Sequence, residues 1–383
     1  MRNSKITVVL AFAFLLLPAF LVLLVACGNK GANSTPTPVS VTPAVAVFTG
    51  DASCQECHEK EFKTHQNSRH VRALRFVTEA DMKQDMPTTG KVPNTRYQWE
   101  KKADGSYGWG YVEEPTETMH LAFGSGKSGI AFLGVKDGKG MAEGHLSYYP
   151  PLRRWFVTPG QAGLPPDTLG NFIKKEGAMQ CLTCHTVTFP HDTLMPEKKF
   201  MGVGCESCHG AGSVHIDAMR RKDKAADDLA KLETWGASKL NNMCGRCHRT
   251  VREVIANNLD RKDTDKYQTY GVSISKCFKK SGDKLSCVVC HDPHTDTPQN
   301  SAKTYNDACA RCHSEPKTVL TKPRLMETKL CPVNKTGNCI QCHMPIKERS
   351  LFPGSPRRIA DHFIHIQGKE GNAYDLNNFK EIP

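Results

Sequence analysis

Seven short clusters of cysteine and histidine dominate the chemistry available to this sequence. Each cluster reads Cys-x-x-Cys-His, and together they use fourteen of the seventeen cysteines. Two thiols at this spacing can form thioether bonds to the vinyl groups of a haem, and the histidine that follows can bind the iron. The cysteines are Cys54, Cys57, Cys181, Cys184, Cys205, Cys208, Cys244, Cys247, Cys287, Cys290, Cys309, Cys312, Cys339 and Cys342. The histidines are His58, His185, His209, His248, His291, His313 and His343.

Structural zinc sites and thiol redox centres also use Cys-x-x-Cys pairs, so the motif alone leaves them open. A zinc site does not need a histidine directly after each pair, whereas axial ligation of an attached haem does. All seven pairs carry that histidine. The sequence therefore predicts seven covalently attached c-type haems, and with them iron-based redox chemistry, in place of zinc.

The N-terminus predicts export. Arg2 and Lys5 precede an apolar run over 6–26, which is typical of a signal peptide. The run ends in Leu-Val-Ala-Cys27-Gly, which resembles a bacterial lipobox, in which the cysteine becomes the lipidated first residue of a lipoprotein. The alternative is an uncleaved membrane anchor that ends at Cys27. Both place the folded chain on the periplasmic face of a membrane or at the outer membrane, where haem attachment takes place.

Composition and turn signals divide the chain into five parts. Hydrophobic residues make up 39% of the chain, and Pro- and Gly-rich linkers are frequent, so seven packed porphyrins are expected to supply much of the core. We predict a mostly α and irregular, haem-packed multihaem cytochrome c fold with a small β-rich insertion. The parts are a signal peptide with lipobox at 1–27, a disordered linker at 28–45, a first haem segment at 46–79, the β-rich insertion at 80–165 and a multihaem domain with six haems at 166–383.

Local patterns predict some of the elements. Apolar residues at helical spacing indicate helix over much of 46–77 and over 214–258. Aromatic residues alternate on both sides of Asp104-Gly105, which predicts a hairpin of 97–99 with 107–111. A second hairpin is expected over 130–149.

The formal charge of +12 does not indicate nucleic-acid binding once the cofactors are counted. Removal of Arg2 and Lys5 with the signal leaves +10, and the fourteen propionates of seven haems bring this to −4. Seven ferric haem cores, each with one positive charge, return the total to about +3. The basic residues mostly offset propionates, and no nucleic-acid partner is expected.

Several motifs resemble those of the cytochrome c-554 family of multihaem c-type cytochromes, over about 50–75 and 180–365. The resemblance implies bis-histidine haems in stacked and perpendicular pairs that carry electrons outside the cell membrane. In larger members of the family a histidine follows Gly-Ser-Gly, whereas this chain has Lys127-Ser128-Gly129 there, so a ligand at that place is not expected. The matching pieces are Ser68-x-His70, Cys205-Glu-x-Cys-His-Gly-x-Gly-Ser-x-His215, Cys287-x-x-Cys-His-Asp-Pro-His294, Cys342-His-Met-Pro345 and Asp361-His362.

Nine histidines remain as candidates for the second axial position, although each could also be an ordinary solvated side chain. The family motifs favour His70, His215, His294 and His362 as distal ligands. His120 and His191 complete the candidate set, and His65, His145 and His365 rank below them. Six candidates for seven haems leave one iron that is five-coordinate or bound by methionine or water.

Two cysteines, Cys277 and Cys331, lie shortly before haem motifs and outside them. In an exported protein they are expected to form a disulfide, and the alternative is two separate buried thiols.

These features predict a membrane-tethered heptahaem electron carrier between periplasmic or membrane donors and outer acceptors, with redox proteins as partners. The alternative is an oxidoreductase acting on a small nitrogen or sulfur compound at one open haem. No Cys-x-x-Cys-Lys motif of the kind that marks multihaem nitrite reductases occurs, so the carrier is favoured and no catalytic residue is assigned. Any open haem is expected in the N-terminal half, beside the β-rich insertion, with Tyr148, Tyr149, Arg153 and Arg154 as candidate neighbours. The alternative is a fully six-coordinate set in which His120 or His145 fills the place.

Overall fold

The computed structural model describes residues 45–260, 264, 266–296, 302–313, 331, 339–349 and 357–365. The signal peptide with Cys27, and the linker up to residue 44, lie outside the described residues. All contacts below belong to the unit that begins at Val45. Within the described ranges, none of the helices combines the length and the apolar character that a membrane crossing requires.

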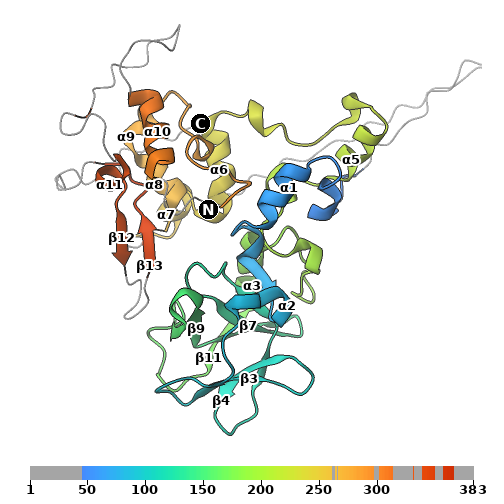
Figure 1. Ribbon diagram of the computed structural model, residues 1–383, viewed down its shortest axis with the longest axis vertical. Helices are drawn as coiled ribbons and strands as arrows, with labels where there is room; N and C mark the ends of the chain where they lie inside the picture. The colour runs from blue at the N-terminus through green and yellow to red at the C-terminus, as the bar shows by residue number, and fades with distance from the viewer. Residues whose placement is uncertain are drawn as a thin grey trace, which may run out of the picture. The chain divides into compact units, whose positions relative to one another are not determined.

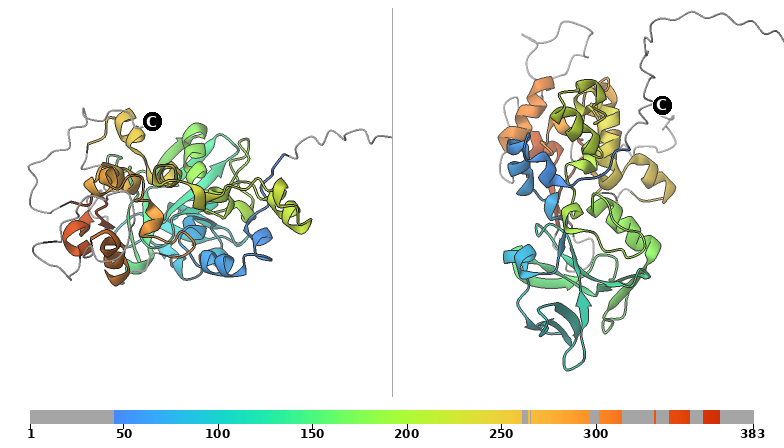
Figure 2. Two further views of the ribbon diagram at one scale, coloured as in Figure 1. Left: turned by 90° about the horizontal axis from the view of Figure 1, so that it is seen from above. Right: turned by 90° about the vertical axis from the view of Figure 1, so that its right-hand side faces the viewer.

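A β-rich region runs from Leu74 to Lys174, and all of its strand pairs are antiparallel (Figures 1 and 2). A five-stranded sheet has the order β1-β6-β7-β8-β11, formed by Leu74–Phe76, Leu121–Phe123, Ala131–Lys136, Gly140–Gly144 and Gly170–Lys174. A four-stranded sheet has the order β2-β3-β4-β5, formed by Gly90–Lys91, Tyr97–Lys101, Tyr107–Tyr111 and Glu117–Met119. A two-stranded ribbon pairs β9 with β10, formed by Leu146–Tyr149 and Arg154–Val157.

The predicted hairpins are confirmed in one case and partly wrong in the other. β3 pairs with β4 as expected, with Trp99 opposite Trp109. In the second case β7 pairs with β8 across Asp137-Gly138, where both φ angles are positive, 41° and 69°, as a tight two-residue turn requires. The next strand, β9, pairs with β10 instead of β7. The insertion at 80–165 was also predicted too short, since β1 and β11 lie outside it and belong to the larger sheet.

The β-rich region has its own hydrophobic core, which the expectation of a porphyrin core did not foresee. Aromatic rings fill the space around Trp99, which is 0% exposed and has a ring-centre distance of 4.5 Å to Phe132. A second buried cluster joins the larger sheet to helix α3, Lys175–His185, through Leu121 and Leu182. This contact fixes a helix that ends on a haem motif to a rigid sheet.

The remaining described chain is helical and irregular, as predicted, but its helices are short. The expected helix over 46–77 is limited to α1, and the one over 214–258 breaks into α5, α6 and α7, with Gly236 as the N-cap of α6. A hairpin pairs β12, Ile346–Arg349, with β13, Arg357–Ala360. The helices other than α3 are α1 Glu59–Gln66, α2 Glu79–Met82, α4 Glu206–His209, α5 Ser213–Arg220, α6 Ala237–His248, α7 Val251–Ala256, α8 Gln268–Ile274, α9 Lys276–Lys280, α10 Ala302–His313 and α11 Cys339–His343.

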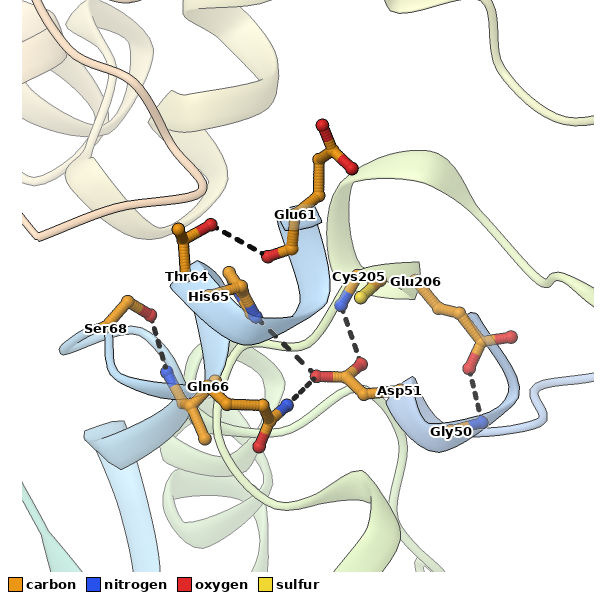
Figure 3. A network of polar contacts seen from close by, with 10 residues as sticks. Gly50, Asp51, Glu61, Thr64, His65, Gln66, Ser68, Cys205 and Glu206 are labelled. Carbon is orange, nitrogen blue, oxygen red and sulfur yellow. Dashed lines mark hydrogen bonds and ion pairs between the residues drawn. The ribbon is translucent and has the colours of Figure 1, made fainter. Parts of the chain in front are cut away.

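The carboxylate of Glu206 ties the first haem segment to the third haem motif (Figure 3). Its side chain accepts hydrogen bonds from the backbone N–H groups of Thr49 at 3.0 Å, Gly50 at 2.8 Å and Gly212 at 2.8 Å. Glu206 is only 4% exposed, so these charge-assisted bonds replace its lost hydration. Segments more than 150 residues apart are thereby held together.

We predict that Glu206→Gln destabilises the haem-loaded protein by about 1–3 kcal/mol, because an amide presents one acceptor oxygen and no charge to these N–H donors. Chemical denaturation followed by tryptophan fluorescence measures the change in the free energy of unfolding. Glu59→Gln is the matched control, since Glu59 is exposed and pairs only with Lys63 one turn away. Equal stability of the two variants would contradict the prediction.

Candidate haem centres

Each haem motif forms a single helical turn. The helices α3, α4, α6, α10 and α11 all end on a motif histidine. In the other two motifs the backbone N–H of His58 donates to Cys54 at 3.0 Å, and that of His291 donates to Cys287 at 3.0 Å. Side chains at positions i, i+3 and i+4 of a helical turn lie on one face. Both sulfurs and the imidazole can therefore reach the same porphyrin.

Four motif histidines face a second histidine from a distant part of the chain. An iron bound by imidazole on both faces needs the two ring centres about 6.2 Å apart, because a metal–imidazole bond is roughly 2.0 Å long and the ring centre lies about 1.1 Å behind the nitrogen. The observed ring-centre distances are 6.4 Å for His58–His215, 6.3 Å for His70–His248, 6.3 Å for His209–His294 and 6.2 Å for His291–His362. These donor pairs fit six-coordinate haem iron.

In each pair, the histidine that lies outside a haem motif is one of the four that the family motifs favoured. None of them serves the haem motif next to it in the sequence. His70 follows the first motif but faces the fourth, and His215 follows the third motif but faces the first. His294 and His362 face the third and fifth motifs. That these residues bind iron stays a prediction, which the spacing supports.

Hydrogen bonds at Nδ1 turn the other ring nitrogen of several distal candidates towards the facing histidine. His215 Nδ1 lies 2.9 Å from Asp227 Oδ1, and His362 Nδ1 lies 2.9 Å from the carbonyl oxygen of Ala360. A fixed N–H donor of this kind selects Nε2 as the ligand atom and sets the ring orientation. Burial lowers the pKa of His362 to about 4 and also lowers the pKa of His70, which favours the neutral form that binds a metal.

The structure does not bring His120 or His191 opposite any motif histidine. Nδ1 of His120 accepts a hydrogen bond from the backbone N–H of Val135 at 3.0 Å, so the imidazole belongs to the sheet. His191 lies on an exposed turn and packs on Phe189, with a ring-centre distance of 5.0 Å. Their selection as distal ligands is therefore not supported. Position relative to a motif in the sequence does not reveal such local contacts.

Three motif histidines have no facing histidine, namely His185, His313 and His343, although all sixteen histidines lie within the described residues. His185 lies at the edge of the β-rich region, as expected for an open site. Its Nδ1 is 2.8 Å from the carbonyl oxygen of Ala73, and its ring packs on Phe123 with a ring-centre distance of 4.9 Å.

The neighbours expected for that site stay a prediction, since their observed contacts lie within the β-rich region. Tyr148 packs on Trp155 in the aromatic core, with a ring-centre distance of 5.3 Å, and β9 and β10 pair with each other. This pairing occupies the strands that carry Tyr149 and Arg154, and Arg153 lies in the turn between them. The charged groups that act on the Cys181 thiol are instead Glu143 and Arg249.

One cysteine prediction and one cluster of possible metal ligands remain to be compared with the structure. The disulfide between Cys277 and Cys331 is not formed, because Cys277 carries a free thiol on α9, where burial raises its pKa. Asp51, His65 and Cys205 offer three ligand atoms within 4.8 Å of one another (Figure 3). Cys205 belongs to a haem motif, so its sulfur is used for attachment, and Asp51 orients that motif by accepting from the Cys205 N–H at 2.8 Å.

Comparison with known proteins gives a consistent class. The family described as cytochrome c554 and c-prime matches residues 53–110 and 168–210, and a doubled CXXCH motif matches 280–318. The chain is 28% identical over 186 residues to the multiheme cytochrome MtrA of Shewanella baltica (strain OS185), covering 46% of this chain and 48% of MtrA. It is 22% identical to the dissimilatory sulfite reductase MccA of Wolinella succinogenes, covering 78% of this chain and 50% of MccA. The chain thus spans about half the length of these curated relatives.

Two solved structures are similar at lower levels. The outer cell wall cytochrome OcwA has a TM-score of 0.48 at 14% identity, covering 83% of this chain and 79% of OcwA. The undecaheme cytochrome from the S-layer of Carboxydothermus ferrireducens has a TM-score of 0.43 at 14% identity, covering 85% of this chain and 53% of that one.

The seven Cys-x-x-Cys-His turns and the family matches support the class of multihaem c-type cytochromes. Within this class, the segments 53–110 and 168–210 are similar to cytochrome c554, as the motifs indicated.

The angles between facing rings predict a distinctive spectrum. The rings of His70 and His248 cross at 71°, whereas the other three pairs have interplanar angles of 15–33°. Rings that cross at a large angle leave the iron d orbitals nearly degenerate and give a highly anisotropic low-spin EPR signal. We expect one such signal in the oxidised protein and its loss in His70→Met.

His120→Ala is the control and should leave every low-spin signal in place. The assignment fails if His70→Met retains the anisotropic signal, or if His120→Ala removes a signal.

Proposed function

We propose that this chain is an exported, membrane-tethered c-type cytochrome with seven haems, which passes electrons between periplasmic or membrane donors and outer acceptors. The four histidine pairs at 6.2–6.4 Å carry this proposal. Histidines on both faces of an iron leave it no open position for a substrate. Such a site suits one-electron transfer, which is the chemistry that bound haem supplies.

The chain has several means of setting a graded series of potentials. The carboxylate of Asp227 beside His215 increases the basicity of that ligand, which favours ferric iron at the first site. At the fifth site, His362 bonds to the neutral carbonyl of Ala360, and both facing histidines have pKa values lowered by burial. Burial disfavours charged states, so the two sites are expected to differ in potential.

The tether is proposed from the N-terminal sequence. The apolar run, the lipobox at Cys27 and the polar linker would hold the folded part near a membrane while leaving it free to meet redox proteins. The attachment of seven haems agrees with export, since haem attachment takes place outside the cytoplasm.

We predict that Cys27→Ser moves the protein from the membrane fraction to the soluble fraction without changing its cofactor content, because the lipid anchor is lost while all haem motifs remain. Cell fractionation followed by a pyridine haemochrome assay measures both properties. Seven haems per chain are expected before and after the substitution. Membrane retention of the variant would contradict the lipid anchor, and far fewer haems would contradict the heptahaem assignment.

A second candidate function is the oxidation or reduction of a small nitrogen or sulfur compound at the His185 site. The specific observation is that no histidine faces His185, and a relative of similar sequence is named a dissimilatory sulfite reductase. Burial raises the pKa of Glu143, which favours the protonated form of its carboxyl group as a proton donor. Arg249 offers a cation to an anionic ligand.

This second function predicts that one iron binds external ligands. Cyanide or nitric oxide added to the protein should change the EPR signal of one haem and leave the four bis-histidine haems unaltered, because only an open axial position accepts a ligand. Glu143→Gln should shift the pH dependence of that binding. Spectra that stay unchanged with nitrite, cyanide and nitric oxide would remove this candidate and leave the carrier function.

A further inference from the structure

Cysteines of different haem motifs touch one another. Cys184 Sγ in the second motif lies 3.5 Å from the carbonyl oxygen of Arg246 in the fourth. Side-chain hydrogen bonding between motifs also contributes to the pKa shifts of four cysteine pairs: Cys54 with Cys205, Cys184 with Cys247, Cys244 with Cys287, and Cys309 with Cys339. Each sulfur is one bond away from the porphyrin substituent that it attaches. Sulfurs in contact therefore bring two porphyrin edges within a few bonds of each other. The pairs link the first site to the third, the fourth to the second and fifth, and the sixth to the seventh. His291 of the fifth motif packs on Tyr305 of α10, which ends on the sixth motif, with a ring-centre distance of 5.5 Å.

Helix α6, which ends on the fourth motif at His248, contacts three other motifs. Cys247 Sγ lies 3.9 Å from the carbonyl oxygen of Cys184 in the second motif. Arg246 donates from Nη2 to the carbonyl oxygen of Ser207 in the third motif at 2.5 Å. Asn241 of α6 contacts the fifth motif at Cys287. No comparable set of contacts surrounds another motif within the described residues.

Asn241 holds the fifth motif against α6. Its Oδ1 accepts hydrogen bonds from the backbone N–H of Cys287 at 2.9 Å and from the Cys287 thiol at 3.2 Å. Its Nδ2 donates to the carbonyl oxygen of Leu285 at 3.2 Å. Asn241 is 2% exposed, so these hydrogen bonds satisfy the polar atoms of a buried amide. It is a positioning residue for the spacing of the fourth and fifth sites.

We propose that the haem site at His70 and His248 is a three-way junction for electrons. One arm leads to the second site at His185 beside the β-rich region. The second arm leads through the third site at His209 to the first site at His58. The third arm leads through the fifth site at His291 towards the sixth and seventh sites. The inference rests on the proposed heptahaem carrier and adds its route.

A junction gives the His185 site a role under both candidate functions. Electrons that reach this side arm can come from either of the two other arms. A donor and an acceptor can therefore bind at different ends of the haem series without competing for one docking site. The four facing histidine pairs include the junction and both first steps of the longer arms. The side arm ends at His185, one of the three motif histidines that no histidine faces.

The number of haems adjacent to one haem can be determined from the potentials that change when that haem is reduced. Methionine in place of one axial histidine raises the potential of that haem, which then becomes reduced first. The added electron disfavours reduction of directly adjacent haems, because Coulomb interaction falls with distance. We expect His70→Met to lower the reduction potentials of three other haems, at the second, third and fifth sites.

Two matched variants complete the series. His362→Met changes the fifth site, which has two neighbours, and His215→Met changes the first site, which has one. EPR-monitored redox titrations of the haem-loaded proteins should show three, two and one lowered potentials for the His70, His362 and His215 variants. If the His70, His362 and His215 variants instead show two, two and one lowered potentials, the haems form an unbranched chain and the junction is wrong. His248→Met alters the same iron from its other face and replaces His70→Met if that variant loses haem.

The same samples separate this inference from the proposed function. A haem count near seven with the expected low-spin signals supports the carrier even where the series contradicts the junction. A low haem count contradicts the carrier itself, whatever the titration shows.

Discussion

Histidines from distant segments face one another at spacings that fit axial ligation of iron, and this pairing is the constraint on which the helical part of the protein depends. The first segment supplies His70 to the fourth motif, while the third motif region supplies His215 to the first. Each iron would therefore crosslink parts of the chain that lie far apart in the sequence. The helices in this part are short and few of their side chains form large apolar clusters, so the cofactors and their ligands have to supply the order.

The β-rich region is held together by its own side-chain packing. Its aromatic core around Trp99 and its second cluster against α3 are built from ordinary side chains and do not need a porphyrin. It gives the second motif a rigid support, since His185 bonds to Ala73 next to β1. A region that folds on its own packing can hold one haem site in a fixed environment. Of the three motif histidines that no histidine faces, His185 is the one that this region supports.

The sequence predicts which residues are candidates for haem binding better than it predicts which of them face one another. The motif turns follow from spacing alone, and four distal histidines follow from short motifs next to them. Which motif each of them faces depends on long-range folding that no local pattern contains. His70 follows the first motif but faces the fourth, and His215 follows the third but faces the first. His120 was selected because it lies in the insertion, yet a single backbone hydrogen bond engages it in the sheet. Asp227 and Asn241 carry no motif, and only their contacts in three dimensions identify them.

The central claim is that paired histidines from distant segments hold the irons. Anomalous diffraction at the iron absorption edge, measured on crystals of the haem-loaded protein, tests it most directly because it locates iron independently of the protein atoms. The account predicts seven iron peaks, four of them midway between the rings of His58 and His215, His70 and His248, His209 and His294, and His291 and His362. An iron peak beside His209 or His291 whose opposite face is not occupied by His294 or His362 would contradict it.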